Sequence, residues 1–275
     1  MINMLQDLFS YTFIIRALIV GVLVALVASL LGVSLVLKRY SMIGDGLSHV
    51  GFASLSIAMA LNLAPLEVTL PIVTVAAFFL LKISENSKIK GDAAIALISS
   101  SALALGVIVI SLTTGMNTDV CNYMFGSILA MSKSDVYLSV ALSITVLVLY
   151  VFFYHQIFAI TFDETFSKAT GTKTGMYNML IAILTAITIV VGMRMMGALL
   201  ISSLIIFPSL TSMRVFGSFK AVVISSAILS VVCFFIGIII SFAYSIPAGA
   251  SVVAVNLIAF IVFSIIGYSK KIVRL

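Results

Sequence analysis

Nine long apolar runs, separated by short polar connections, divide this chain of 275 residues. A helix that crosses the hydrocarbon core of a bilayer needs about 20 apolar residues. The runs cover about 13–37, 43–62, 66–83, 93–115, 134–154, 177–192, 195–213, 220–244 and 248–268. Only 9% of the residues are charged, whereas a soluble domain carries about 25%. The sequence therefore predicts an all-α polytopic membrane protein with about nine transmembrane helices, forming a single transmembrane domain over 1–275.

The basic residues indicate the orientation of these helices. If the N-terminus is outside, only Arg16, Lys133 and Arg194 fall on or near the outer side, which leaves twelve of the fifteen Lys and Arg residues in cytoplasmic connections. This imbalance is the positive-inside pattern. We predict an N-out, C-in protein in contact with the lipid of a bacterial-type plasma membrane. The formal net charge of +6 then needs no nucleic acid to explain it.

Asp45 and His49 lie near the start of the second apolar run. An ionisable residue at membrane depth is costly unless it is paired, faces a cavity or binds an ion. Four residues make about one helical turn, so the carboxylate and the imidazole share a helix face. This donor set suits zinc, manganese or iron. The alternative is that Asp45 caps the start of the helix and His49 is a hydrogen-bonded packing residue.

Two prolines are candidates for irregular backbone. Pro208, near the inner end of the seventh run, is expected to kink or break its helix. Pro247 is expected to begin the last helix, at its first position. Such irregularity at membrane depth is tolerated only where protein or a water-filled cavity covers the backbone. Gating of a transport path and simple packing are the two explanations.

The connection at about 155–176 is the largest predicted cytoplasmic feature. Phe158, Phe162 and Phe166 recur every four residues beside Asp163 and a second acidic residue. This spacing predicts a short amphipathic helix with an apolar stripe. Such a helix would fill a groove on a partner protein or lie flat on the membrane.

No motif for ATP hydrolysis accompanies this connection. The sequence Gly-Thr-Lys-Thr at 171–174 resembles the end of a phosphate-binding loop, but Phe166 stands where the first glycine is needed. The polar connections are also too short for a soluble catalytic domain. We predict that the chain is not an enzyme and that any ATPase is a separate subunit.

Four elements of the sequence resemble the ABC-3 family of metal permeases. The element Gly-Asp-Gly-Leu-Ser-His at 44–49 follows a basic pair, and Met-Phe-Gly-Ser-Ile-Leu-Ala at 124–130 follows Asp119. A glycine-led stretch that ends in proline covers 197–208, and Pro-Ala-Gly-Ala-Ser-Val-Val covers 247–253. Together they span most of the chain in the family's order. The last two elements resemble the zinc branch more than the manganese branch.

The resemblance implies a type II ABC importer-like bundle. Its permease would form a homodimer, bind a cytoplasmic ABC ATPase and receive metal from an extracytoplasmic metal-binding lipoprotein. Asp45 and His49 would contact the metal, and Pro208 and Pro247 would lie on gating elements. The residues implied for coupling to the ATPase are Phe162, Asp163, Glu164, Ala169 and Gly171.

We therefore predict the permease subunit of an ATP-driven importer for a divalent transition metal, with zinc favoured over manganese or iron. The metal is the cargo, and no permanently bound cofactor is expected. A proton-coupled secondary metal carrier is the alternative, in which Asp45 and His49 would form a proton relay. Inverted repeats would favour that carrier, and none is evident in the sequence.

Overall fold

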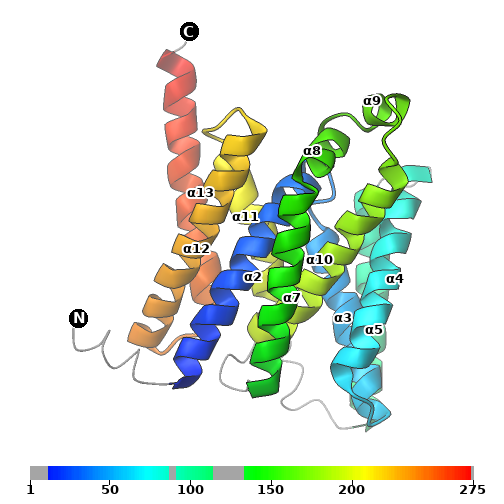
Figure 1. Cartoon of the computed structure of the whole chain (residues 1–275). Coiled ribbons are helices and arrows are strands. Elements are labelled where there is room, and N and C mark those ends of the chain that lie inside the picture. The colour runs from blue at the N-terminus through cyan, green and yellow to red at the C-terminus, as the bar shows by residue number, and fades with distance from the viewer. Residues whose placement is uncertain (1–11, 87–90, 114–132, 274–275) are drawn as a thin grey trace.

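The computed structural model describes residues 12–86, 91–113 and 133–273. These residues form helices, with no strand within the described ranges (Figure 1). The helices are α2 (Thr12–Leu37), α3 (Ile43–Ala60), α4 (Pro65–Asn86), α5 (Gly91–Thr113), α7 (Lys133–Phe152), α8 (Tyr154–Phe162), α9 (Glu164–Ala169), α10 (Thr174–Met196), α11 (Ala198–Met213), α12 (Phe219–Tyr244) and α13 (Ala248–Val273). The motif at 124–130 and Asp119 lie outside the described residues.

Every apolar run of the sequence falls on a helix in the described part of the chain. Among the described residues, five helices are long and apolar enough to cross a membrane, namely α2, α5, α10, α12 and α13. Helices α7 and α8 would make a sixth span if they are taken together, although the chain bends by 68° between them. The all-helical, multi-pass architecture is confirmed, and the number of nine spans stays a prediction.

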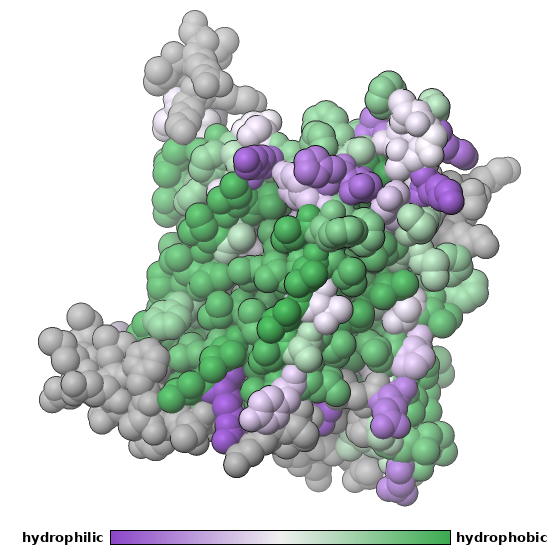
Figure 2. Space-filling view, viewed as in Figure 1, coloured by the Kyte–Doolittle hydropathy of each residue, from purple (hydrophilic) through white to green (hydrophobic). Residues whose placement is uncertain are grey.

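The long helices run in alternating directions. Helix α2 begins at the lower end of the molecule in Figure 1, and α13 finishes near the upper end. The turn after α2, the α8–α9 segment and the α11–α12 connection lie at this same upper end. They hold basic residues such as Lys38, Lys168 and Arg214. Figure 2 shows a broad hydrophobic belt between the more hydrophilic ends, as a bilayer requires.

Helix α2 packs against α7, α10, α11 and α12. Gly32 makes the contact with α11 possible, because a Cβ atom there would lie 2.1 Å from the backbone oxygen of Ile205. Gly21 has the same role towards α12, where a Cβ atom would lie 2.1 Å from the ring of Phe234. Small residues of this kind let membrane helices approach closely.

Serine hydroxyls add hydrogen bonds between α2 and the late helices. Ser209 of α11 and Ser226 of α12 both donate to the backbone oxygen of Ser29, each over 3.4 Å. Ser230 of α12 donates to the backbone oxygen of Ala25 over 2.8 Å. The hydroxyls are buried, so these bonds remove the cost of burying them without a partner. They tie the first described helix to residues that follow it by 180 to 205 positions.

Gly197 and Pro247 stand at helix boundaries, whereas Pro208 lies inside a helix. Gly197 separates α10 from α11 with φ 85° and ψ 160°, a conformation that glycine alone adopts easily. Helix α11 continues through Pro208 to Met213, so this proline does not end the helix. Pro247 directly precedes α13, and its backbone oxygen accepts a hydrogen bond from the Ser251 amide at 3.1 Å. It therefore stands one residue before the predicted position, within the usual uncertainty of helix ends.

Candidate functional site

A tight turn brings the chain from α2 into α3. The Tyr40 amide donates to the Leu35 oxygen over 2.8 Å, and the Arg39 amide donates to the Val36 oxygen over 3.1 Å. Arg39 has φ 63°, in the left-handed region where this type of helix end usually places glycine. The Ile43 amide then donates to the Tyr40 oxygen over 3.0 Å as α3 begins. Lys38 lies within this closed turn, between the two residues of the Arg39–Val36 bond.

Asp45 and His49 lie on one face of α3, as their spacing predicts. The Asp45 Oδ2 atom and the His49 Nε2 atom are 3.6 Å apart, with 41% of the Asp45 side chain and 16% of the His49 side chain exposed. The distance is slightly longer than a hydrogen bond. The carboxylate oxygen and the imidazole nitrogen therefore point to the same region and could bind one cation together.

Asp45 does not cap the start of α3, contrary to the alternative interpretation of the sequence. The residue that precedes α3 is Met42, and its side chain makes no capping hydrogen bond. Asp45 lies within the first turn instead, where a carboxylate is favoured by the partial positive charge of the helix N-terminus. At this position the Asp45 carboxylate does not serve as the helix cap, so it is available to a ligand.

Close packing on several sides fixes α3. A Cβ atom on Gly44 would lie 3.0 Å from Ile205 of α11, one on Gly46 would lie 2.7 Å from Ile95 of α5, and one on Gly51 would lie 2.7 Å from Met193 of α10. The helix also packs against α4. Glycines thus let neighbouring helices approach α3 next to Asp45 and His49, which restricts the rotation and shift of the helix that holds the pair.

No group of three or more His, Cys, Asp or Glu side chains that could hold a metal occurs among the described residues. Asp45 and His49 thus supply at most two such ligands from this part of the chain. A resident structural metal usually has four protein ligands.

The connection after α7 contains two short helices rather than one. Helix α8 ends at Phe162, Asp163 is extended with φ −148° and ψ 96°, and α9 begins at Glu164. The prediction of one continuous amphipathic helix is therefore wrong, because Asp163 ends one helix and caps the next. Phe158 and Phe162 remain neighbours on α8, with ring centroids 5.6 Å apart, while Phe166 belongs to α9.

The side chains that this segment exposes are aromatic. Phe162 is 73% exposed and Phe166 is 66% exposed. Phe158 is more covered, at 38% exposed, and its ring centroid lies 4.9 Å from that of Phe219 at the start of α12. Two large apolar side chains are therefore exposed on α8 and α9, and Figure 1 shows these two helices at the upper end of the molecule.

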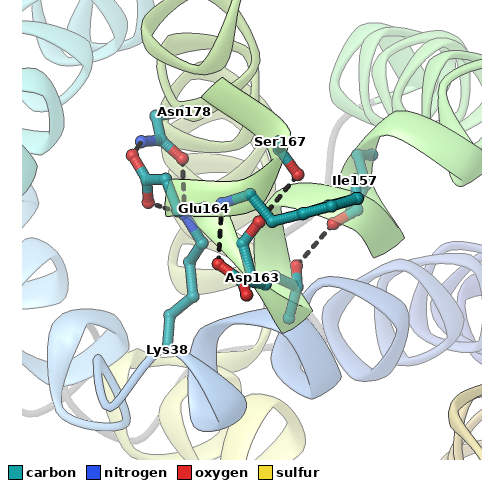
Figure 3. A network of polar contacts seen from close by, with 8 residues as sticks. Lys38, Ile157, Asp163, Glu164, Ser167 and Asn178 are labelled. Atoms are coloured by element: carbon teal, nitrogen blue, oxygen red, sulfur yellow. Dashed lines mark hydrogen bonds and ion pairs between the residues drawn. The ribbon is translucent and has the colours of Figure 1, made fainter. Parts of the chain in front are cut away.

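The two acidic residues of the segment make contacts within the chain. Asp163 Oδ1 accepts a hydrogen bond from the Phe166 amide over 2.9 Å and so caps α9. Glu164 Oε2 pairs with Lys38 Nζ over 2.9 Å, and Glu164 Oε1 accepts a hydrogen bond from Asn178 Nδ2 over 2.8 Å (Figure 3). In the sequence, Lys38 indicates orientation and belongs to the basic pair before the 44–49 element, and nothing singles out Asn178.

Gly171 completes the end of α9. Its φ is 88° and a Cβ atom would meet nothing within 4 Å. The Thr172 amide donates to the Ser167 oxygen over 2.9 Å, and the Gly171 amide donates to the Lys168 oxygen over 3.2 Å. This is the two-bond helix end that needs a left-handed residue. Ala169 is exposed next to it.

Comparisons with known proteins agree on one family. The profile of the ABC 3 transport family matches residues 10–267. The chain is 30% identical over 258 residues to the manganese import system permease protein ScaB of Streptococcus gordonii, covering 94% of this chain and 92% of that protein. It is 32% identical over 234 residues to the high-affinity zinc uptake system membrane protein ZnuB of Buchnera aphidicola, covering 85% and 89%. The solved structure of PsaBC from Streptococcus pneumoniae in complex with Fab matches with a TM-score of 0.85 and 29% identity, covering 96% of this chain and 95% of that chain.

Proposed function

Because the chain belongs to the ABC 3 transport family, we propose that it is the membrane-spanning permease subunit of an ATP-driven importer for a divalent transition metal ion. The resemblance found in the sequence motifs is thereby confirmed. The observation that supports this function most directly is the Asp45–His49 pair, 3.6 Å apart on one face of the enclosed helix α3. The family match and the named relatives give the proton-coupled carrier no support.

The two ligands contribute in different ways. The Asp45 carboxylate offsets the charge of the cation, and the His49 imidazole supplies a directional nitrogen ligand. Conduction requires a site that binds strongly enough to be entered and weakly enough to be left. Two protein ligands with partly exposed side chains fit that requirement. The ion is cargo, and it leaves the site towards the cytoplasm.

Zinc is the cargo that we propose to test first. This preference rests on the resemblance of the late sequence elements to the zinc branch. A carboxylate and an imidazole suit manganese and iron as well, and the relatives include a protein named for manganese and one named for zinc.

The proposed orientation is N-out and C-in with nine spans. It places the α8–α9 segment and the turn after α2 on the cytoplasmic side, together with the basic residues of that end. Within the same proposal Phe162, Asp163, Glu164, Ala169 and Gly171 form the segment that contacts an ABC ATPase. The exposure of Phe162 and Phe166 supports such a contact, because buried aromatic anchors dominate many interfaces.

Partners and gating complete the proposal. Two copies of the chain would form the permease, two copies of the ATPase would bind at its cytoplasmic end, and an extracytoplasmic metal-binding lipoprotein would deliver the ion. Pro208 lies inside α11 and Pro247 precedes α13. Helix α11 packs against both α3 and α13, so a movement of α11 or α13 would reach the helix that holds the metal pair.

The test measures total cell zinc, manganese and iron in a strain that lacks this chain and grows with scarce metal. The strain is complemented with wild type, Asp45→Asn, His49→Gln, or Glu67→Ala as a control, since Glu67 is an exposed acidic residue at the start of α4. We expect one metal to fall selectively and to return with wild type and Glu67→Ala only. Normal metal content in both site variants at normal protein level would contradict the assignment. A selective fall in manganese or iron would keep the permease and change its cargo.

A further inference from the structure

Lys38, Glu164 and Asn178 form a closed ring of three polar contacts (Figure 3). Lys38 Nζ lies 2.9 Å from Glu164 Oε2 and donates to Asn178 Oδ1 over 2.5 Å. Asn178 Nδ2 donates to Glu164 Oε1 over 2.8 Å. Each side chain thus contacts the other two, and both oxygens of the carboxylate are used. We call these residues the polar triad.

The polar triad joins three segments that are far apart in the sequence. Lys38 follows the last residue of α2, Glu164 is the first residue of α9, and Asn178 lies in the first turns of α10. Asn178 is buried, and only 10% of the Lys38 side chain is exposed, against 40% for Glu164. Partial burial strengthens a charge-assisted contact, so the contact between α9 and the bundle is stronger than a surface ion pair of the same length.

The position of Lys38 connects this contact to the metal pair. Lys38 lies within the closed turn that leads into α3, and Asp45 lies in the first turn of that helix. The turn is held by the hydrogen bonds of Tyr40 to Leu35 and of Ile43 to Tyr40. A displacement of the Lys38 ammonium therefore acts on a short, hydrogen-bonded segment rather than on a slack loop.

We propose that the polar triad is a positioning device that couples the displacement of α9 to the start of α3, and so to Asp45 and His49. This inference rests on the proposed function, because it assumes that a partner moves the α8–α9 segment. Glu164 transmits the movement inward to Lys38, while Asn178 holds the carboxylate and the ammonium in register. The exposed aromatic side chains of the segment remain free to contact the partner.

A brace that only stabilises the fold is the competing explanation, and transport per ATP in variants that still fold and bind the ATPase separates the two. Charge exchange tests whether the attraction between the two side chains is what matters. In Lys38→Glu combined with Glu164→Lys, the ion pair is restored in the opposite direction. The Asn178 amide has a donor and an acceptor end and serves either direction after rotation. The controls are the single changes Lys38→Met and Lys38→Glu, and Lys173→Met at an exposed lysine between α9 and α10.

The first measurement uses the full permease with its ATPase in lipid vesicles and counts metal ions transported per ATP hydrolysed. We expect Lys38→Met and Lys38→Glu to lower this ratio at least fivefold while the ATPase still co-purifies. The exchanged pair should recover at least half of the wild-type ratio, and Lys173→Met should match wild type. An unchanged ratio in Lys38→Met, or no recovery in the exchanged pair when that protein is folded, would overturn the inference.

The second measurement distinguishes failure of the inference from failure of the proposed function. Spin labels at Thr165 of α9 and Met42 before α3, both exposed, report their separation in a cysteine-free background with and without ATP. With Lys38 present the two labels should move as one unit and keep a narrow distance distribution. In Lys38→Met the distribution should broaden at least twofold. Equal distance distributions in wild type and Lys38→Met would contradict the inference. A wild-type permease that transports no metal would contradict the proposed function, and the distance distributions could still be compared.

Discussion

The start of α3 and the α8–α9 segment are held in place by different means. Four helices surround α3, and three glycines let them approach so closely that a Cβ atom would collide with or crowd a neighbour. Most side chains of α9 are exposed, and a few directional contacts at Asp163 and Glu164 fix the helix. Packed surfaces hold ligands in constant geometry, whereas a small set of polar contacts lets a segment shift as a unit. The contrast indicates a rigid site and a movable segment.

The largest expected effect tests the packed side of this comparison. In Gly46→Ala the new Cβ atom would lie 2.7 Å from Cγ2 of Ile95, a β-branched side chain with little freedom to rotate. We expect a loss of about 1–3 kcal/mol in stability and a lower melting temperature of the purified protein in detergent. Gly175→Ala is the matched control, because nothing lies within 4 Å of its Cβ position. Equal melting temperatures would show that α3 is not tightly enclosed.

The next effect concerns the surface of the movable segment. Replacing Phe162 and Phe166 together by alanine should change the stability of the permease by less than about 1 kcal/mol, since both are mostly exposed. Affinity for the ATPase should fall by about 2 kcal/mol, or roughly 30-fold, in a titration of the two purified proteins. Tyr244→Ala, with a side chain that is 74% exposed at the other end of the bundle, should bind normally. A double variant that binds like wild type would remove the aromatic pair from the interface.

A backbone substitution tests how α9 ends. Gly171→Ala places a Cβ atom in a left-handed conformation, which costs roughly 1–2 kcal/mol. No side chain crowds the position, so the cost is confined to the backbone. Hydrogen exchange of the Gly171 and Thr172 amides should therefore accelerate by about tenfold. Gly171→Asn should exchange more slowly than Gly171→Ala, because asparagine tolerates this conformation better; the reverse order would exclude backbone strain as the cause.

The smallest effect is loss of the α9 cap. Asp163→Ala removes the acceptor of the Phe166 amide and should cost about 1 kcal/mol. The amide of Phe166 should then exchange about fivefold faster, while the melting temperature of the whole bundle stays the same. Asp163→Asn keeps an acceptor and should exchange like wild type. A global loss of stability in Asp163→Ala would mean that α9 is not a separately moving unit.

Local features of the fold followed from the sequence. The apolar runs gave every long helix within the described residues, because the length needed to cross a bilayer is a property of the segment alone. The shared face of Asp45 and His49 followed from a spacing of four residues. The bend between α7 and α8 and the extended conformation of Asp163 were missed, since the Phe158–Phe162–Phe166 spacing continues across a break that Asp163 creates.

Contacts between distant segments had no signal in the sequence. Lys38 and Glu164 are 126 positions apart, and Lys38 and Asn178 are 140 apart. Neither periodicity nor a motif pairs them, and a basic residue beside a membrane helix is explained equally well by orientation. The close approaches at Gly44, Gly46 and Gly51 could not be predicted either, since their partner helices are defined by the tertiary fold.

The serine bonds between α2 and the late helices have a consequence for biosynthesis. Ser209 and Ser226 bond to α2 from positions 180 and 197 residues further along the chain. At a synthesis rate of 5–20 residues per second, α2 would emerge roughly 10–40 s before these partners exist. During that interval the glycine face of α2 has to be covered by lipid or by the insertion machinery. Assembly of this bundle is therefore expected to finish only when α11 and α12 are released from the ribosome.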